Sequence, residues 1–378
     1  MNGWKRYLAL ILTFFLVGLM LPLNQAAAAP SVSAQAAAVI DVDSGRILYQ
    51  KQGNAKLRIA SLTKVMTAIV AIEEGNLQDR ITVPDYAVGT EGSSIYLKRG
   101  EKLTLENLLY GLMLRSGNDA AVTIADSIGG SIEGFAQLMN EKAEYLGLSG
   151  THFTNPHGLD DSNNHYSSAI DLAKITAYAL HNPEFQKIVS TQVKMIPQEG
   201  EKWDRKLYNK NKMLRLYDGA DGVKTGYTKL AKRCLVSSAT RDGRQIAVVT
   251  LNAPNDWDDH ARLLDYGFQQ FKPTQIVGEN ERVDEQEGLY TVNSFSYPLS
   301  QEEEGKIEKK VIKNHAVDKM FPGVVVGYLH IYLGNEEIGK VGLTRKEART
   351  SSHVVQPGLW THFLQILKLF VLGGIQNG

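Results

Sequence analysis

The spacing of apolar residues changes along the chain, and each spacing predicts a different element. Residues 36–52 read as two strands around Asp43-Ser44-Gly45, a sequence that favours a tight turn. Residues 61–74 carry apolar side chains at helical intervals, and Gly75 ends that stretch. We therefore expect a β-hairpin that is followed by a helix.

Further helices are expected in the middle of the chain. One begins at Thr104 and another near Asn118. A third begins at Ser168, which forms a capping-box pattern with Asp171. Residues 233–252 then form two β-rich runs. Because strands flank a helical middle, we expect one sheet that is built from both ends of a large domain.

The composition changes after Pro273. Residues 275–350 are rich in β-forming residues and in charges of both signs, and Gly334-Asn335 separates two apolar runs. This stretch predicts a small all-β domain. The expected fold class for the whole chain is α/β (α+β), with a sheet flanked by helices in the larger domain.

The last segment, residues 358–373, has an apolar face at helical spacing. It is shorter than the roughly 20 residues that a membrane-spanning helix needs, and it suits an amphipathic helix lying on a membrane surface. The alternative is a terminal helix that docks on the protein's own core. The apolar side chains of this face are Trp360, Phe363, Leu364, Ile366, Leu367, Phe370 and Val371.

The N-terminus has the layout of a secretory signal. Two basic residues, Lys5 and Arg6, precede a charge-free apolar run over residues 7–23. Small residues follow, and cleavage after Ala28 fits this layout. The alternative is an uncleaved membrane anchor. In both cases we expect the rest of the chain to lie outside the cytoplasm.

Composition limits the possible functions. The chain has 378 residues, of which 41 are basic, 41 are acidic and 43% are hydrophobic, as is typical of a globular protein. A neutral chain without a basic block argues against nucleic-acid binding. The single cysteine, Cys234, excludes an intramolecular disulfide and a cysteine-rich metal site. The expected organisation is a signal peptide at 1–28, a large domain at 29–272, the all-β domain at 275–350 and the amphipathic helix at 358–373.

Three short motifs contain candidate catalytic and substrate-binding residues. Ser61 and Lys64 lie three positions apart, so a helix places them side by side on one face. Ser116-Gly117-Asn118 lies between two expected helices, and Lys224-Thr225-Gly226 precedes an expected strand. The Ser-Asn pattern also occurs at Ser162-Asn163-Asn164, in a polar loop. We prefer the first copy, because side chains converge where two helices meet.

The first motif suits acyl transfer to a serine. A serine hydroxyl needs a base within hydrogen-bonding distance. A free lysine, with a pKa of about 10.4, is protonated at neutral pH, but burial and a second cation lower that pKa toward about 7–8. Lys224 is a candidate for the cation that acts on Lys64. Ser61 also lies near a helix N-terminus, where free N–H groups can stabilise an oxyanion.

The other two motifs suit a peptide substrate. Ser116 is suited to relay a proton to a leaving amine, and Asn118 offers an amide to a peptide bond. Lys224 and Thr225 offer a cation and a hydroxyl to a terminal carboxylate. Gly226 lets a substrate backbone lie against the strand. We expect no cofactor.

The chain resembles the serine-type D-alanyl-D-alanine carboxypeptidases, the low-molecular-weight penicillin-binding proteins. The resemblance rests on the three motifs and on longer stretches, namely IASLTKVMTA, TEGSSIYL, YGLMLRSGNDAA, TNPHGLDDSNNHY, GVKTGYTKLAKR and NDWDDH. It covers residues 34–272 and is strongest to the sporulation-type enzymes of endospore-forming bacteria, which trim spore-cortex peptidoglycan. It implies a penicillin-binding-protein and β-lactamase-like fold, with an antiparallel sheet covered by helices on both faces.

The resemblance also implies roles, partners and a location. Ser61 would form an acyl-enzyme, Lys64 would activate it and Ser116 would shuttle a proton. The N–H groups of Ser61 and Tyr227 would form an oxyanion hole. The implied partners are peptidoglycan stem peptides, β-lactams and the membrane surface; the implied location is the outer face of the membrane, the cell wall or the forespore intermembrane space. The implied substrate-binding residues are Asn118, Lys224, Thr225, Gly226 and Tyr227.

Two other functions remain open. A serine β-lactamase shares the acyl-enzyme, but a class A enzyme places a base glutamate on an omega loop. No matching Glu-x-x-Leu-Asn occurs here, where the comparable stretch reads TNPHGLDD. A non-catalytic wall-binding protein on the same fold is the second alternative, and the intact motifs argue against it.

Clustered histidines and acidic residues invite a metal-site interpretation. His152, His157 and His165 do not have the spacing of a helical ligand pair. We therefore expect structural hydrogen bonds in a turn-rich loop. The acidic residues around Trp257 lack the glycine and the terminal glutamate of a calcium loop. They predict a strand-to-helix connection, and we expect no metal.

Overall fold

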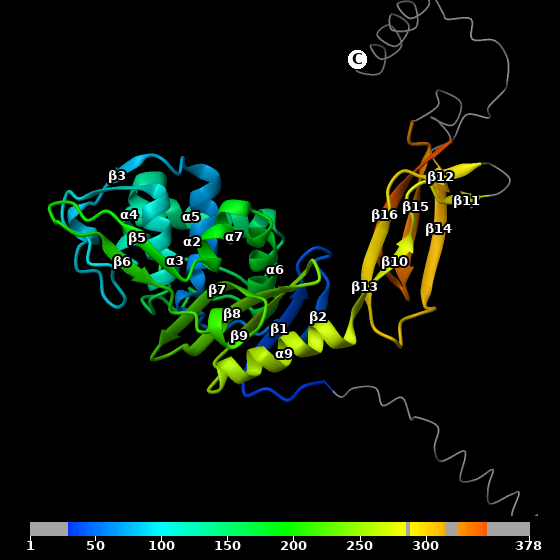
Figure 1. The fold of residues 1–378 in the computed structure, drawn as a ribbon, viewed down its shortest axis with the longest axis horizontal. Coiled ribbons are helices and arrows are strands. Elements are labelled where there is room, and N and C mark those ends of the chain that lie inside the picture. The colour runs from blue at the N-terminus through cyan, green and yellow to red at the C-terminus, as the bar shows by residue number, and fades with distance from the viewer. Residues whose placement is uncertain (1–28, 285–287, 314–323, 346–378) are drawn as a thin grey trace, which may run out of the picture. The chain divides into compact units, whose positions relative to one another are not determined.

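Figure 1 shows a computed structural model of the chain. It describes residues 29–284, 288–313 and 324–345. The expected signal peptide, 1–28, and the expected amphipathic helix, 358–373, lie outside these residues. Among the described residues, no helix is both long enough and apolar enough to cross a membrane.

Contacts divide the described residues into two compact units. The first unit holds the residues up to Thr274 together with Tyr297–Glu304. The second holds Gln275–Ser296 and the residues from Gly305 on. Each unit has a hydrophobic core of its own.

A five-stranded antiparallel sheet forms the middle of the first unit (Figure 1). Its order is β2-β1-β9-β8-β7, and Ala36 of β1 lies opposite Leu251 of β9. The N-terminal hairpin thus pairs with strands from the far end of the unit, as the sequence predicted. The strands are β1 (Ala36–Asp41), β2 (Ile47–Lys51), β7 (Ala220–Thr228), β8 (Lys232–Arg241) and β9 (Arg244–Leu251).

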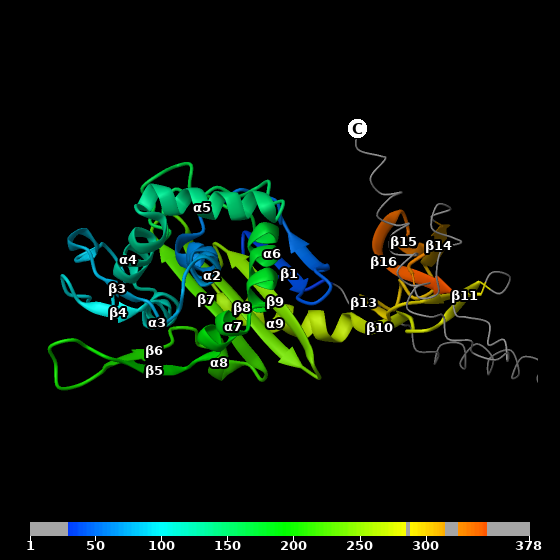
Figure 2. The same cartoon turned by 90° about the horizontal axis from the view of Figure 1, so that it is seen from above.

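Helices cover both faces of this sheet (Figure 2). Ile40 of β1 belongs to the larger core, with α2 (Lys64–Glu74) and α6 (Ala169–Leu180). Val39, the preceding residue, belongs to the core on the other face, with α9 (Asp256–Gln270). This alternation is the period of two that a strand requires. The expected α/β fold class is therefore confirmed.

Capping side chains fix the start of several helices. The Thr104 hydroxyl accepts a hydrogen bond from the Asn107 N–H at 3.2 Å, and the Ser168 hydroxyl accepts one from the Asp171 N–H at 3.1 Å. Both helix starts agree with the prediction. The helix that Ser131 caps was not expected. The other described helices are η1 (Ala60–Thr63), η2 (Asp85–Ala87), α3 (Leu105–Arg115), α4 (Asn118–Gly129), α5 (Ile132–Tyr145), α7 (Pro183–Ser190) and α8 (Met213–Leu216).

The acidic residues around Trp257 lie in the first turn of a helix. The sequence predicted that they lie in the connection between a strand and a helix, so the predicted start of the helix was a few residues too late. Helix α9 begins at Asp256, and three carboxylates occupy its first turn. Negative charges are favourable there, because they face the positive end of the helix dipole. Asp259 also accepts hydrogen bonds from Ser33 and from the N–H of Ala34, which ties α9 to the segment before β1.

Two short β-hairpins extend the first unit. They are β3 (Arg80–Thr82) with β4 (Lys102–Thr104), and β5 (Val193–Ile196) with β6 (Arg205–Tyr208). Arg205 of β6 donates to Glu101, just before β4, with a nitrogen–oxygen distance of 3.0 Å. The two side chains are only 9% and 1% exposed. A buried ion pair therefore joins the two hairpins.

In its described residues the second unit is all-β, as expected. Its five-stranded sheet has the order β11-β12-β16-β15-β14, and its core includes Leu329, Ile331 and Leu343. The turn at Gly334-Asn335 separates β15 from β16, as predicted. The strands from this part of the chain are β10 (Lys272–Val277), β11 (Arg282–Asp284), β12 (Leu289–Thr291), β13 (Phe295–Leu299), β14 (Ile307–Lys313), β15 (Gly327–Leu333) and β16 (Glu336–Arg345).

Replacing Glu101 by Gln is expected to destabilise the protein. The Arg205 guanidinium would stay buried without its charged partner. Breaking a buried ion pair typically costs about 3–5 kcal/mol, so the free energy of unfolding, measured by urea denaturation, should fall by about 3 kcal/mol. Lys98→Gln is the control, because the exposed Lys98–Glu201 pair should contribute less than about 1 kcal/mol. Equal effects of the two substitutions would contradict this account.

Candidate active site

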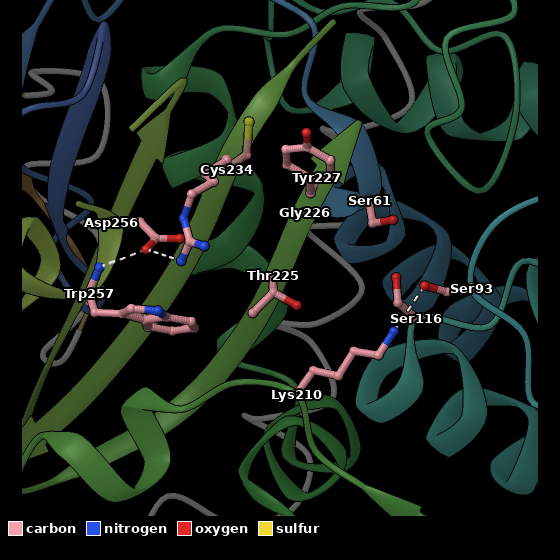
Figure 3. Close-up of a pocket in the computed structure, with 11 residues that line it drawn as sticks. Ser61, Ser93, Ser116, Lys210, Thr225, Gly226, Tyr227, Cys234, Asp256 and Trp257 are labelled. Carbon is pink, nitrogen blue, oxygen red and sulfur yellow. Dashed lines mark hydrogen bonds and ion pairs between the residues drawn. The ribbon is translucent and has the colours of Figure 1, made fainter. Parts of the chain in front are cut away.

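A pocket of about 560 Å³ lies beside strand β7 (Figure 3). The pocket is lined by residues from the turn η1, from the junction of α3 and α4, and from the neighbouring strands β7 and β8. Five of the predicted site residues line it, namely Ser61, Ser116, Thr225, Gly226 and Tyr227. The other described lining residues are Ser93, Lys210, Arg233, Cys234, Asp256 and Trp257.

Ser61 lies in the 3₁₀ turn η1, immediately before α2. The preceding residue, Ala60, has a left-handed φ of 48°, a conformation that costs a non-glycine residue about 1–3 kcal/mol. Gly158 packs against this turn, and a Cβ at Gly158 would lie 1.9 Å from the Ala60 carbonyl oxygen. The turn that presents Ser61 thus depends on a glycine in a distant loop, which the Ser-Lys spacing does not reveal.

Lys64 begins α2, and its side chain is completely buried. Its Nζ lies 3.1 Å from Ser61 Oγ, 2.7 Å from Asn118 Oδ1 and 2.7 Å from the His157 carbonyl oxygen. The amide and carbonyl oxygens can only accept hydrogen bonds, so they take two N–H groups of the amine. In a neutral amine the lone pair then faces the Ser61 hydroxyl.

The surroundings of Lys64 favour this neutral form. Burial lowers the pKa of Lys64 well below its ordinary value, and the charges of Lys224 and Lys210 lower it further. Burial, together with Lys210, also lowers the pKa of Lys224 to about 7. An amine with a depressed pKa can act as a base near neutral pH. The arrangement can therefore take a proton from Ser61.

Ser116 and Asn118 occupy the junction of α3 and α4. Ser116 follows α3 with a left-handed φ of 64° and lines the pocket. The Asn118 amide accepts a hydrogen bond from Lys64 and donates one to the Glu91 carbonyl oxygen at 2.5 Å. An amide has two N–H groups, so Asn118 has one more donor than this contact uses. The junction predicted from the sequence therefore does contact the Ser-Lys pair.

Asp119 fixes the loop that completes this side of the pocket. Its carboxylate is buried and accepts hydrogen bonds from the N–H groups of Ile95 and Leu97, at 3.1 and 3.0 Å. The same loop carries Ser93, which lines the pocket. The sequence motif ends one residue before Asp119, so the motif did not reveal this residue.

The second copy of the Ser-Asn pattern lies elsewhere. Asn163 accepts a hydrogen bond from Arg58 at 2.6 Å in an exposed part of the loop. Residues 162–164 are not among the described residues that line the pocket. The structure therefore places Ser116 in the pocket with Ser61, and it does not place Ser162 there.

The loop histidines make structural hydrogen bonds, as the sequence predicted. His165 Nε2 lies 2.8 Å from Thr63 Oγ1, and His157 supplies its carbonyl oxygen to Lys64. Burial lowers the pKa of His157 to about 3 and that of His165 to about 4, so both are neutral at neutral pH. In the described part of the chain, no group of three His, Cys, Asp or Glu residues is arranged to hold a metal ion.

The Lys224-Thr225-Gly226 motif lies inside β7. The expected strand does follow the motif, as β8, but the motif itself lies in a strand that was not expected, because β7 begins at Ala220. Successive side chains of a strand alternate, so Thr225 and Tyr227 share one side and Lys224 takes the other. The Lys224 side chain is buried, and its Nζ donates to the Thr225 carbonyl oxygen at 2.7 Å. A Cβ at Gly226 would lie 3.2 Å from the Ser61 nitrogen, so this glycine allows β7 to approach η1.

Two cationic side chains reach the pocket from outside the motifs. Lys210 donates a hydrogen bond to Ser93 Oγ at 2.9 Å. Arg233, on β8, pairs with Asp256 at the start of α9, with a distance of 2.5 Å. These residues come from separate elements, so their positions in the sequence bear no fixed spacing to Ser61. Sequence reasoning therefore missed both.

Cys234 forms part of the pocket wall but is 1% exposed. Burial raises the pKa of its thiol to about 12, which keeps it in the unreactive thiol form. It lies within β8, in the part of the chain where residues 233–252 predicted strands.

Two sequence profiles match the chain. One, described as D-alanyl-D-alanine carboxypeptidase, matches residues 23–255, which is more than half of the chain. The other, described as the C-terminal domain of penicillin-binding protein 5, matches residues 271–351. The two profiles therefore account for most of both units.

Individual relatives agree with these profiles. The chain is 36% identical to D-alanyl-D-alanine carboxypeptidase DacF of Bacillus subtilis over 260 residues, which cover 66% of each chain. It is 32% identical to D-alanyl-D-alanine carboxypeptidase DacC of Escherichia coli over 344 residues, covering 83% of this chain and 84% of the relative. Its structure is similar to that of penicillin binding protein 5 from Haemophilus influenzae, with 27% identity, a TM-score of 0.69 and coverage of 84% and 97%.

Lys64 and Lys224 should titrate at unusually low pH. In protein labelled with 13C at the lysine ε-carbons, we expect midpoints below the ordinary lysine value, with that of Lys224 near 7. Lys210→Gln should move both midpoints to higher pH, because the charge of Lys210 lowers both pKa values. Lys212→Gln removes an exposed charge nearby and should leave both midpoints in place. Ordinary midpoints for every lysine would contradict this electrostatic account.

Proposed function

The chain belongs to the D-alanyl-D-alanine carboxypeptidase family, and we propose that Ser61 is its nucleophile and Lys64 the general base. The enzyme is a serine-type D-Ala-D-Ala carboxypeptidase related to penicillin-binding protein 5. The observation that carries the residue assignment is the buried Lys64 amine 3.1 Å from the Ser61 hydroxyl. Its other two contacts are acceptors, so its lone pair is directed to that hydroxyl.

The first step forms an acyl-enzyme. Lys64 takes the proton of the Ser61 hydroxyl while Oγ attacks the carbonyl carbon of the penultimate D-alanine. The carbonyl oxygen becomes an oxyanion, and the N–H groups of Ser61 and Tyr227 are the proposed donors to it. Gly226 supports this role, because a residue without a side chain lets β7 lie next to the Ser61 nitrogen.

Collapse of this intermediate expels the terminal D-alanine. The carbon–nitrogen bond breaks, and the leaving amine takes up the proton from Lys64 through Ser116. Asn118 holds the peptide, while Thr225 and Lys224 attract its terminal carboxylate. Water then attacks the ester, with Lys64 again as the base, and releases the shortened peptide.

The same serine is the proposed site of β-lactam acylation. The β-lactam carbonyl would acylate Ser61 in the same way, but its leaving amine would stay attached to the adduct. Asp256 is the only carboxylate among the described residues that line the pocket, and it is paired with Arg233. The described pocket thus offers no free carboxylate for the deacylating role that a glutamate has in class A β-lactamases. This favours a long-lived penicillin adduct over the β-lactamase alternative.

Members of this family act on peptidoglycan outside the cytoplasm. We propose that residues 1–28 export this chain and that residues 358–373 attach it to the outer face of the cytoplasmic membrane. The support is the sequence pattern of these two segments, which lie outside the described residues. The resemblance to sporulation-type enzymes supports a role in maturation of the cell wall or spore cortex.

Ser61→Ala is expected to abolish catalysis, because it removes the atom that forms the acyl-enzyme. Release of D-alanine from a diacyl-D-Ala-D-Ala peptide should fall at least ~1,000-fold, and labelling by penicillin should disappear. Circular dichroism should show that the variant remains folded. Penicillin labelling that survives this substitution would identify a different nucleophile.

Ser162→Ala is the matched control for this substitution. Ser162 belongs to the second copy of the Ser-Asn pattern and lies outside the described pocket lining. This variant should keep both penicillin labelling and D-alanine release. Rapid turnover of penicillin by the unaltered protein would instead support the β-lactamase alternative.

Mass spectrometry of muropeptides tests the biological setting. In a strain that lacks this protein, spore-cortex muropeptides should keep more terminal D-alanine if the enzyme acts during sporulation. A change confined to vegetative walls would place its role in growth instead. Unaltered muropeptides from both sources would contradict both settings.

A further inference from the structure

We propose that one end of the all-β unit binds the surface of a bilayer that contains anionic phospholipids. An apolar patch on the outer face of the five-stranded sheet would make this contact, together with a row of basic residues beside it. The proposal goes beyond the catalytic function, because it assigns a partner to the second unit and uses no residue of the pocket. The apolar patch consists of Val292, Ile312, Val325 and Tyr328.

Strand alternation gives this sheet one buried face and one outer face. Val311 packs against the core of the unit, and Leu329 is part of that core. The neighbouring residues Ile312 and Tyr328 therefore point to the other side of the sheet. They lie directly opposite one another on β14 and β15 (Figure 1), and they are 53% and 44% exposed. Two large apolar side chains thus meet on the outer face.

Two valines extend this pair across β16. Gly342 lies opposite Tyr328, and a Cβ at Gly342 would lie 3.4 Å from the Val325 side chain and 3.5 Å from that of Val292. Both valines therefore lie over this glycine, on the outer face, and Val325 is 38% exposed. Contiguous apolar side chains on an exposed face mark a surface that binds a protein or a membrane.

The charge changes along the strands, away from the apolar patch. The next row on the outer face holds Lys310, His330 and Lys340, which lie opposite one another on β14, β15 and β16. The row beyond it holds Glu308 and Glu337. Side chains on one face repeat every two residues, so successive rows lie about 7 Å apart. The outer face therefore passes from apolar to basic to acidic.

The contacts of the basic row leave it able to bind an anion. Lys310 pairs with Glu308 at 3.4 Å, and the two side chains are 61% and 63% exposed. Such exposed pairs are weak, so a phosphate can replace the carboxylate. The Lys340 ammonium lies 5.3 Å from the centre of the Tyr328 ring. This lysine therefore places a positive charge directly beside the apolar patch.

This order of side chains matches the layers of an anionic bilayer surface. The headgroup region on each side of a bilayer is about 5–7 Å thick, which is close to the spacing between two rows. With the apolar patch at the hydrocarbon boundary, Lys310 and Lys340 would lie among the phosphates, and the glutamates would stay in water. A tyrosine also suits the boundary between hydrocarbon and water. Charge complementarity thus favours an anionic lipid surface as the partner.

The chain leaves the unit at the same end. Strand β16 runs from Glu336, beside the acidic row, to Arg345, beyond the apolar patch. The segment 358–373, which we propose to attach the protein to the membrane, follows Arg345 in the chain. The end of the unit that carries the apolar patch is therefore the end that is tethered to this segment.

The test measures the depth of single residues in vesicle-bound protein. The protein is used in its exported form, with residues 346–378 in place, and Ile312→Cys and Glu336→Cys are labelled with a fluorescent maleimide. Cys234 should stay unlabelled, because it is 1% exposed and burial raises the pKa of its thiol to about 12. The vesicles contain equal parts of phosphatidylglycerol and phosphatidylcholine. Bromine on the lipid acyl chains should quench the label at position 312 and spare the label at position 336.

Substitutions test whether the patch and the basic row contribute to affinity. Ile312→Thr combined with Tyr328→Thr keeps residues that favour a strand and should weaken vesicle binding about 10-fold. Lys310→Gln combined with Lys340→Gln should weaken it about 10-fold on the same vesicles, but not on phosphatidylcholine alone. Leu216→Thr is the control, because Leu216 is 63% exposed in the first unit, and it should bind like the unaltered protein. Thermal unfolding checks that each variant is folded.

A protein that does not bind the vesicles, a label at position 312 that bromine does not quench, or equal quenching at both positions would overturn the inference. Full affinity in both double variants would also overturn it, and would indicate that the patch binds a protein instead. Failure of the proposed catalytic function gives a separate result, namely vesicle-bound protein that penicillin does not label and in which the quenching pattern is unchanged.

Discussion

The chemistry of this protein depends on keeping the Lys64 amine uncharged inside the fold. Its contacts are the Ser61 hydroxyl, the Asn118 amide oxygen and the His157 carbonyl oxygen, all of which are neutral. A carboxylate in place of any of them would stabilise the ammonium form and remove the base. The nearby Lys224 opposes protonation further. The fold therefore buries this amine with no carboxylate of the described residues in contact with it, although the charge of Asp119 opposes the lowering of its pKa. Such burial is unfavourable in itself and must be offset by packing elsewhere.

Close approach between separate elements makes this burial possible. Gly226 lets β7 lie against η1, and Gly158 lets a distant loop pack on the carbonyl of Ala60. Asp119 anchors the loop on the other side of the pocket. None of these elements holds the site alone. The pocket therefore exists only when the sheet and the helical layer have packed together, so its geometry depends on the core of the whole first unit.

The sequence predicted those parts of the site that a regular local structure encodes. Ser61 and Lys64 are neighbours because one helical turn separates them, and the α3–α4 junction is visible from helix signals on both sides. The sequence did not identify Lys210 and Arg233 as pocket residues, because residues on separate elements have no fixed spacing in the chain that links them to the motifs. The contact of His157 with Lys64 was missed for a different reason. It is made by the backbone carbonyl oxygen, a group that every residue has, so the residue type does not reveal it. Strand β7 was not expected at all, because its glycines and aspartate disfavour a strand, and it forms through pairing with β8.

The pairing of β1 with β9 affects when the protein can fold. Ala36 meets Leu251 only after nearly the whole first unit has been synthesised, and contacts between residues so far apart in the chain slow folding. A chain whose central sheet is still open remains able to thread through a translocation channel. For a protein that we propose to be exported, this topology prevents assembly of an active hydrolase before the last strands of the sheet have been made.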